Sequence, residues 1–145
     1  MFYKFMENGP FNFQINRIVT YGEENASVEE IKTITPYTKN MKSWAKNWSR
    51  LAEQAKSESR FSQAAYYYRM AEFYMIDDTP EKMKCYRNFR ECFEKANEGK
   101  MIQRFEIPFE GTFLPAIKID AENSRGFTLF IFYRGKIMGS DNDRC

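Results

Sequence analysis

Histidine is absent from all 145 residues, so any chemistry in this sequence must come from carboxylates, thiols, hydroxyls and amines. Neither a Ser-His-Asp nor a Cys-His relay can be assembled without an imidazole to carry the proton. A zinc site with histidine ligands is excluded for the same reason. Cysteines and acidic residues are therefore the first candidates for a functional site.

The three cysteines do not form a recognisable site. Cys85 and Cys92 are seven positions apart in a predicted helix, where a rise of about 1.5 Å per residue separates their Cα atoms by roughly 10 Å. That separation is too large for a disulfide. Cys145 is the last residue, and no C-x-x-C pair occurs. We expect three reduced thiols, no metal and no cofactor.

Two acidic pairs were considered as sites. Asp77 and Asp78 are adjacent, without further ligands nearby, which is typical of a linker between helices rather than of a metal site. Glu106 and Glu110 lie on one face of a predicted strand, where their carboxylates could converge in an enzyme that needs no histidine. An exposed sheet face gives the same alternation without any chemistry.

The composition is that of a single packed domain. Hydrophobic residues make up 43% of the chain and aromatic residues 17%, which is ample for a core. The net charge is only +2, so we expect no nucleic-acid partner. No apolar run is long enough to span a membrane, and the N-terminus does not read as a signal peptide. We therefore expect a cytoplasmic protein with no membrane partner.

Hydrophobic periodicity predicts an all-helical first hundred residues. The expected helices cover residues 11–20, 27–34, 39–57, 61–76 and 80–96. On the third helix, basic residues occupy a face away from the apolar one; they are Lys39, Lys42, Lys46 and Arg50. Basic residues beside tryptophans can form a nucleic-acid platform. A solvated basic face on an amphipathic helix explains them without a partner.

Aromatic side chains spread around most of the circumference of the fourth helix. A helix that is apolar nearly all round is packed on several sides or lines a cleft. The candidate lid or pocket aromatics are Trp44, Trp48, Tyr67, Tyr68 and Phe73. Such a pocket would take an apolar or acyl small molecule. Ordinary packing between helices is the alternative for each of these residues.

A β-hairpin is predicted over Phe105–Ile119. Apolar residues alternate with others on both sides of a turn at Glu110-Gly111-Thr112. Pro108 and Pro115 each remove a ladder donor, so the hairpin should lie at a sheet edge. The apolar run Phe127–Tyr133 reads as a third, buried strand. The expected fold is α+β, with helices at 1–100, first strands at 101–133 and an irregular tail at 134–145.

Several segments together resemble one group of α/β-hydrolases, those with a helical lid domain ahead of the catalytic core. The segments are Ser62–Ile76, the upstream Trp44 and Trp48, and the downstream motif IPFEGTFLPA. The group includes fermentation-respiration-switch esterase-like proteins and 2,6-dihydroxypseudooxynicotine hydrolase. The resemblance implies hydrolysis of an ester, thioester or C–C bond. It also implies that residues 103–119 are the first two strands and 127–133 the third.

The sequence departs from this family where the catalytic residues would lie. No G-x-S-x-G elbow and no histidine occur, and Tyr133-Arg134-Gly135-Lys136 follows the third strand in place of a Gly-Gly run. We therefore expect a truncated, catalytically incomplete chain that is inactive alone. Its third strand, Phe127 to Tyr133, would then expose an apolar edge and favour self-association.

A tetratricopeptide-like interaction module is the alternative. Residues 61–96 form two predicted helices of about the right total length, with small and aromatic residues alternating. One unit is too few for a stable array, and the first 60 residues hold no second match.

Overall fold

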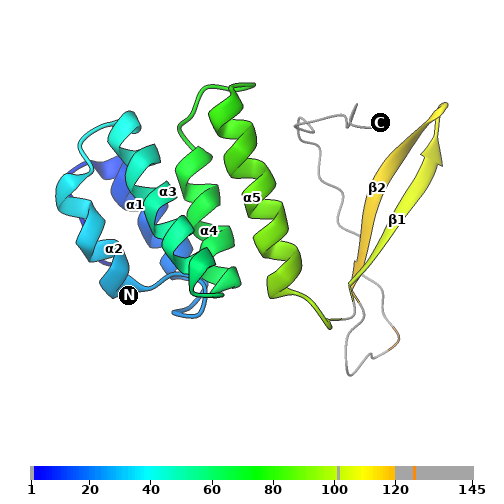
Figure 1. The fold of residues 1–145 in the computed structure, drawn as a ribbon, viewed down its shortest axis with the longest axis horizontal. Coiled ribbons are helices and arrows are strands. Elements are labelled where there is room, and N and C mark those ends of the chain that lie inside the picture. Colours follow the sequence, from blue (N-terminus) through cyan, green and yellow to red (C-terminus); the bar gives the residue numbers. More distant parts are fainter. Residues whose placement is uncertain (1, 101, 120–125, 127–145) are drawn as a thin grey trace. The chain divides into compact units, whose positions relative to one another are not determined.

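The computed structural model describes residues 2–100, 102–119 and 126. Five α-helices precede a two-stranded antiparallel sheet in this part of the chain, which confirms the α+β prediction (Figure 1). The chain separates into two compact units, Met1–Lys100 and Met101–Cys145. The predicted strand Phe127–Tyr133 and the tail 134–145 lie outside the described residues. Within the described part, no helix is long and apolar enough to cross a membrane.

The helices follow the predicted order with shifted ends. They are α1 (Gly9–Val19), α2 (Val28–Ile34), a short 3₁₀ helix η1 (Thr35–Tyr37), α3 (Met41–Ser57), α4 (Phe61–Glu72) and α5 (Pro80–Ala96). The prediction that the fourth helix reaches residue 76 is wrong, because the backbone leaves it at Glu72 through tight turns. This exit lets the Tyr74 ring contact Trp44, at 5.3 Å between ring centroids, and Phe11, at 5.1 Å.

Side-chain caps fix where the helices begin. Asn40 and Ser43 form a capping box, in which the Ser43 N–H donates to Asn40 Oδ1 at 2.9 Å and the Asn40 N–H donates to Ser43 Oγ at 2.9 Å. Helix α3 therefore begins at Met41 rather than at residue 39. Thr79 caps α5, where its hydroxyl oxygen accepts from the Lys82 N–H at 3.4 Å. Ser27 occupies the N-cap position of α2, but its side chain makes no capping hydrogen bond.

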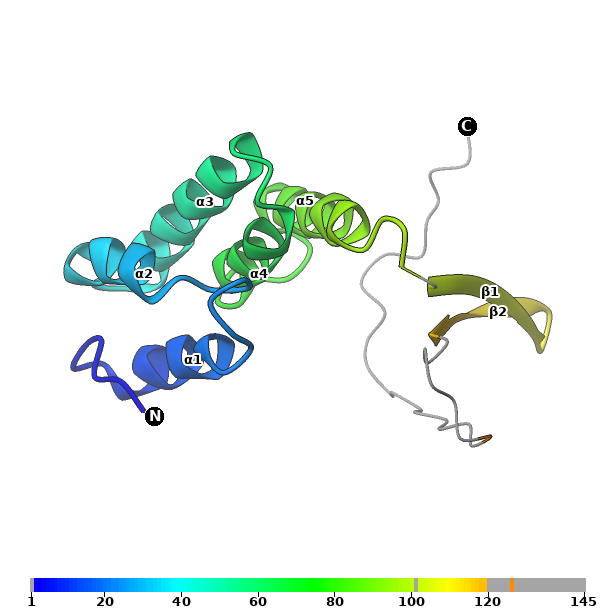
Figure 2. The same ribbon diagram turned by 90° about the horizontal axis from the view of Figure 1, so that it is seen from below.

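The core of the helical unit lies around α4, which packs between α3 and α5 (Figures 1 and 2). Three buried alanines of α4, Ala64, Ala65 and Ala71, let its neighbours approach closely. The turn between α3 and α4 is short, and Ser59 adopts a left-handed φ of 59° within it. The space left by the alanines is filled by large rings from α3 and α4.

The hairpin consists of β1 (Ile102–Phe109) and β2 (Thr112–Ile119), joined by Glu110 and Gly111. These two residues have φ values of 44° and 78°, as a type I′ turn requires. The predicted turn is thus confirmed. The prediction that Glu106 and Glu110 share a strand face is wrong, because Glu110 lies in the turn while Glu106 lies opposite Pro115 on the strand.

The register of the hairpin explains its two prolines. Phe109 and Thr112 flank the two-residue turn, so they form a hydrogen-bonded pair, and such pairs alternate with non-bonded ones along the ladder. Pro108 and Pro115 fall in non-bonded pairs. Each proline therefore places its missing N–H on the outer side of its strand, and the ladder between the strands loses no bond.

Both faces of the hairpin are apolar. Ile107 lies opposite Leu114 on one face, while Phe113 and Ile117 lie on the other. These side chains remain substantially exposed, with Ile107 at 51%, Phe113 at 56% and Ile117 at 55%. A hairpin that is isolated in water is marginally stable at best. Such a surface is typical of a strand pair that belongs to a larger sheet.

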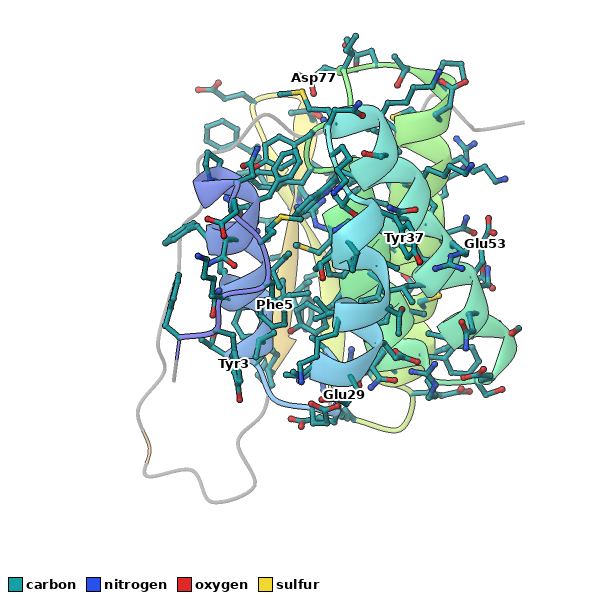
Figure 3. The ribbon with its side chains drawn as sticks, turned by 90° about the vertical axis from the view of Figure 1, so that its left-hand side faces the viewer. Tyr3, Phe5, Glu29, Tyr37, Glu53 and Asp77 are labelled. Atoms are coloured by element: carbon teal, nitrogen blue, oxygen red, sulfur yellow. The ribbon has the colours of Figure 1, made fainter. Side chains whose placement is uncertain are left out.

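The N-terminal segment is bound to α1 by two buried asparagines. Asn16 accepts from the Tyr3 N–H at 2.7 Å and donates to the Tyr3 carbonyl at 2.8 Å. Asn12 accepts from the Phe5 N–H at 2.8 Å and donates to the Tyr3 carbonyl at 3.2 Å. Figure 3 shows Tyr3 and Phe5 beside α1. The two amides hold residues 3–6 through backbone groups alone, as a neighbouring strand would.

We predict that Asn16→Ala lowers the free energy of unfolding by about 1–3 kcal/mol, because it leaves the part-buried Tyr3 N–H without a partner and the Tyr3 carbonyl with Asn12 alone. Urea denaturation measures the loss, and hydrogen exchange should become faster at the Tyr3 amide. Asn88→Ala is the control, since Asn88 accepts only from the exposed end of Lys56. Equal stability of Asn16→Ala and Asn88→Ala would contradict the role of the clamp.

Candidate functional site

Four of the five candidate aromatics are brought together in the core. Trp44, Trp48 and Tyr67 are completely buried, and the ring centroids are 5.5 Å apart for Trp44–Trp48 and 5.6 Å for Trp48–Tyr67. Tyr68 is buried in the same cluster, where burial raises the pKa of its hydroxyl to about 12. Phe73 is 41% exposed and lies under the Arg17 guanidinium, 5.2 Å from its ring centre.

None of these five aromatics lines either of the two hollows described below. Tight packing around the alanines of α4 leaves the rings in contact with one another rather than with an open space. In the described residues Trp44, Trp48, Tyr67 and Tyr68 belong to the core, whereas Phe73 lies at its surface. Periodicity alone cannot distinguish a ring that fills a core from one that lines a cleft.

A polar network surrounds the buried Tyr67 hydroxyl. The hydroxyl accepts from the Ser27 N–H at 2.9 Å and donates to Glu30 Oε2 at 2.8 Å. Arg60 donates to both oxygens of Glu30, at 2.6 and 3.2 Å. Burial is the main cause that raises the pKa of Tyr67, and Glu30 adds to it. The tyrosine therefore stays protonated and ties α2 to α4, with no free base beside it.

A first hollow of about 420 Å³ lies next to this network. It is lined by Glu24, Ser59, Arg60, Phe61, Ser62, Gln63 and Ala96. The positive charge of Arg60 in this hollow is neutralised, because Arg60 pairs with Glu58 at 2.7 Å and with Glu30 at 2.6 Å. The hydrogen bond from Arg60 is the main cause that lowers the pKa of Glu58. The hollow thus presents no unpaired charge from Arg60 to a ligand.

Glu72 is the most deeply buried carboxylate of the described residues, with 3% exposure. It forms an ion pair with Arg69, while its Oε2 atom has no hydrogen-bond partner in the described structure. Removal from water raises its pKa. Buried carboxyl groups with raised pKa values serve as general acids in enzymes, but only where a substrate can reach them.

The neighbouring thiols are not activated. Cys85 is buried and lies 3.8 Å from Ser49 Oγ, and Cys92 is completely buried. Burial is the main cause that raises the pKa of both thiols, so both are protonated at neutral pH. A thiol must ionise to act as a nucleophile. Both cysteines are free, as the sequence predicts, and the described residues contain no group of three metal-binding side chains.

A second hollow, of about 780 Å³, lies on the outer side of α3. It is lined by Tyr37, Lys46, Asn47, Ser49, Arg50 and Glu53. Lys46 and Arg50 belong to the basic face that the sequence indicates. The hollow itself was not predicted, because it depends on η1 bringing Tyr37 beside α3. No local sequence pattern predicts the contact between η1 and α3.

Comparison with known proteins adds no relative. No family model matches the chain, and no curated protein matches it either. The resemblance to α/β-hydrolases stays a prediction.

The raised pKa of Glu72 predicts a pH dependence of stability. Between its usual value of 4.5 and the raised folded value, the folded state binds more protons than the unfolded state. The free energy of unfolding should therefore fall as the pH rises through this interval. Glu72→Gln removes the contribution, so the variant should lose less stability over the same interval in urea titrations.

Glu53→Gln is the control for this experiment, because Glu53 is an exposed carboxylate on α3. Its stability should follow the wild-type pH profile. A stability difference between Glu72→Gln and wild type that is the same at every pH would contradict the assignment.

Proposed function

We propose that this chain supplies the helical N-terminal domain and opening strands of an α/β-hydrolase-type protein. It would not itself catalyse hydrolysis. The order of elements supports the proposal, because a helical unit precedes an antiparallel hairpin that carries the motif IPFEGTFLPA. The sequence lacks both the histidine and the G-x-S-x-G elbow that an active member requires.

The observation that carries the proposal is the apolar character of both hairpin faces. An antiparallel sheet with one face exposed to water normally carries polar residues on that face. Here Ile107 and Leu114 occupy one face while Phe113 and Ile117 occupy the other, all at least 42% exposed. Such strands are stable when both faces are covered, as they are at the start of an α/β sheet with helices on both sides.

The helical unit would act as a lid or wall in such a protein. Its interior is filled by aromatic rings, so a substrate would meet its outer surface rather than enter it. Helical lids exclude water from a substrate held on a catalytic core. An acyl or aromatic substrate agrees with the resemblance.

A tetratricopeptide-like module is the second candidate, and the packing of α3 against α4 favours it. Trp48, Leu51 and Ala52 on α3 are buried in the same core cluster as Ala64 and Tyr68 on α4. This spacing agrees with the W-x₂-L-G and A-x₃-F signatures of the repeat, with alanine in place of glycine. The match lies over α3 and α4 rather than over residues 61–96. Helices α1 and α2, of 11 and 7 residues, do not repeat its lengths.

The proposal predicts that the purified chain hydrolyses p-nitrophenyl acyl esters no faster than the same chain after denaturation. A known esterase in the same assay is the positive control. Turnover that is well above the denatured sample and disappears on heating would overturn the statement that the chain lacks catalysis.

The uncovered hairpin predicts association in solution. Sedimentation should show species larger than a monomer as the concentration rises, since exposed strands with apolar faces pair readily. Replacing Ile107 and Ile117, one on each face, with lysine should shift the distribution toward monomer. Val28→Lys is the control because it lies on α2. A wild-type chain that stays monomeric at high concentration would contradict an uncovered hairpin.

A further inference from the structure

Most basic side chains of the described residues have a partner. Lys56 and Lys95 pair with Glu91, for example, and Arg60 pairs with Glu30. Within the described ranges, six have no ion pair, hydrogen bond or ring contact from the side chain: Lys39, Lys42, Lys46, Arg50, Lys84 and Arg87. All six lie just before or within the first ten residues of α3, or in the first half of α5.

Helices α3 and α5 lie side by side over this region. Ser49 Oγ on α3 is 3.8 Å from Cys85 Sγ on α5. Farther along, Lys56 donates to Asn88 at 3.2 Å and pairs with Glu91 at 2.7 Å. The two helices therefore run in the same direction along this surface.

Helical spacing places the unpaired cations on the adjoining stripes. Lys42 and Lys46 are seven and three residues before Ser49, so they share its side of α3. Lys84 precedes Asn88 by four residues and shares the side of α5 that meets Lys56. The C-terminal end of this surface is neutralised by Glu91. Toward the N-terminal end Lys42, Lys46 and Lys84 are unpaired, and Glu53 and Glu81 are the acidic residues at the same helical spacing.

The hollow of about 780 Å³ lies along the middle of α3, over residues 46–53. Lys46 and Arg50 line it together with the polar side chains of Asn47 and Ser49. Tyr37, which is 71% exposed, forms its border. Figure 3 shows Tyr37 and Glu53 on the same side of the helical unit.

We propose that this basic face, formed by Lys42, Lys46, Arg50, Lys84 and the ring of Tyr37, binds an acidic peptide segment of a partner protein. Carboxylates of the peptide would occupy the positions that Glu91 occupies toward Lys56 at the other end. The exposed ring would cover an apolar side chain between them. The proposal rests on the helical unit alone and does not depend on the hydrolase-type assignment.

The spacing of the cations favours a peptide over a small anion. Lys42 and Arg50 are two turns apart, or about 12 Å along the axis. Their charges are spread along a helix, whereas a phosphate is held by donors that converge on one point. A chain with a carboxylate every few residues matches this distribution.

Two observations disfavour a nucleic acid. Trp44 and Trp48 are completely buried, so they cannot stack on bases as the platform hypothesis required. Glu53 also lies within the hollow, where it would repel a continuous phosphate backbone. A peptide can place a neutral residue opposite Glu53, which a polyphosphate cannot do.

The test uses the full chain and a fluorescently labelled ten-residue peptide in which glutamate alternates with serine, measured by fluorescence anisotropy. We expect saturable binding at 50 mM salt that weakens at least fivefold at 300 mM, because exposed charges are screened at about 8 Å under physiological salt. The same peptide with glutamine in place of glutamate should not bind.

The variant pair K46E/R50E should weaken binding at least tenfold. The control pair K4E/K32E changes the net charge equally at positions away from the basic face, and it should weaken binding less than twofold. Circular dichroism of each variant checks that the helices are retained. Equal losses in the two pairs, or no binding by wild type, would overturn the proposal. Tighter binding of a single-stranded oligonucleotide or of inorganic phosphate would overturn it as well.

Discussion

The close approach of α4 to α3 is the constraint on which the helical unit depends. Alanines on α4 give no side-chain bulk at the contact, so the backbones come near enough for the two tryptophans of α3 to reach across. The indole N–H of Trp44 donates to the carbonyl of Met70. This bond satisfies a buried donor and fixes the position of α3 relative to α4 along the helix axes. A larger residue at Ala64 or Ala71 would have to displace these rings, and overpacking of this kind is destabilising.

The same packing decides where the polar groups of the unit can lie. Because the rings fill the interior, polar side chains lie around its border, where each holds a segment that has no regular structure of its own. Tyr67 directs its hydroxyl to the start of α2, and Asn12 and Asn16 hold the N-terminal segment on α1. Three buried side-chain atoms of the described structure have no hydrogen-bond partner, namely Gln14 Oε1, Trp48 Nε1 and Glu72 Oε2. A closed interior of this kind leaves binding to the outer surface.

Local patterns predicted what depends on neighbours in the sequence. Alternation around Glu110-Gly111 predicted the hairpin and its turn, and the 3.6-residue period predicted five helices close to their observed positions. The end of α4 was not predictable, because Tyr74 leaves the helix for a contact with Phe11, more than 60 residues away. The burial of the candidate aromatics also depends on helices that lie elsewhere in the sequence. Whether Tyr67 lines a cleft or fills a core depends on which helices close over it, and the period of one helix does not contain that information.

Two surfaces of the described residues expose side chains that those residues leave uncovered or unpaired. The hairpin exposes apolar side chains on both faces, and the first halves of α3 and α5 present unpaired cations to solvent. The two surfaces differ in kind. The hairpin favours any apolar cover, whereas the cations of α3 and α5 favour opposite charges at a defined spacing. Catalysis would require the reverse arrangement, with reactive groups held in a cleft that excludes water. In the described residues Tyr67, Tyr68 and Glu72, whose pKa values burial raises, are enclosed within the helical unit. This distribution supports the two proposals of association with another surface.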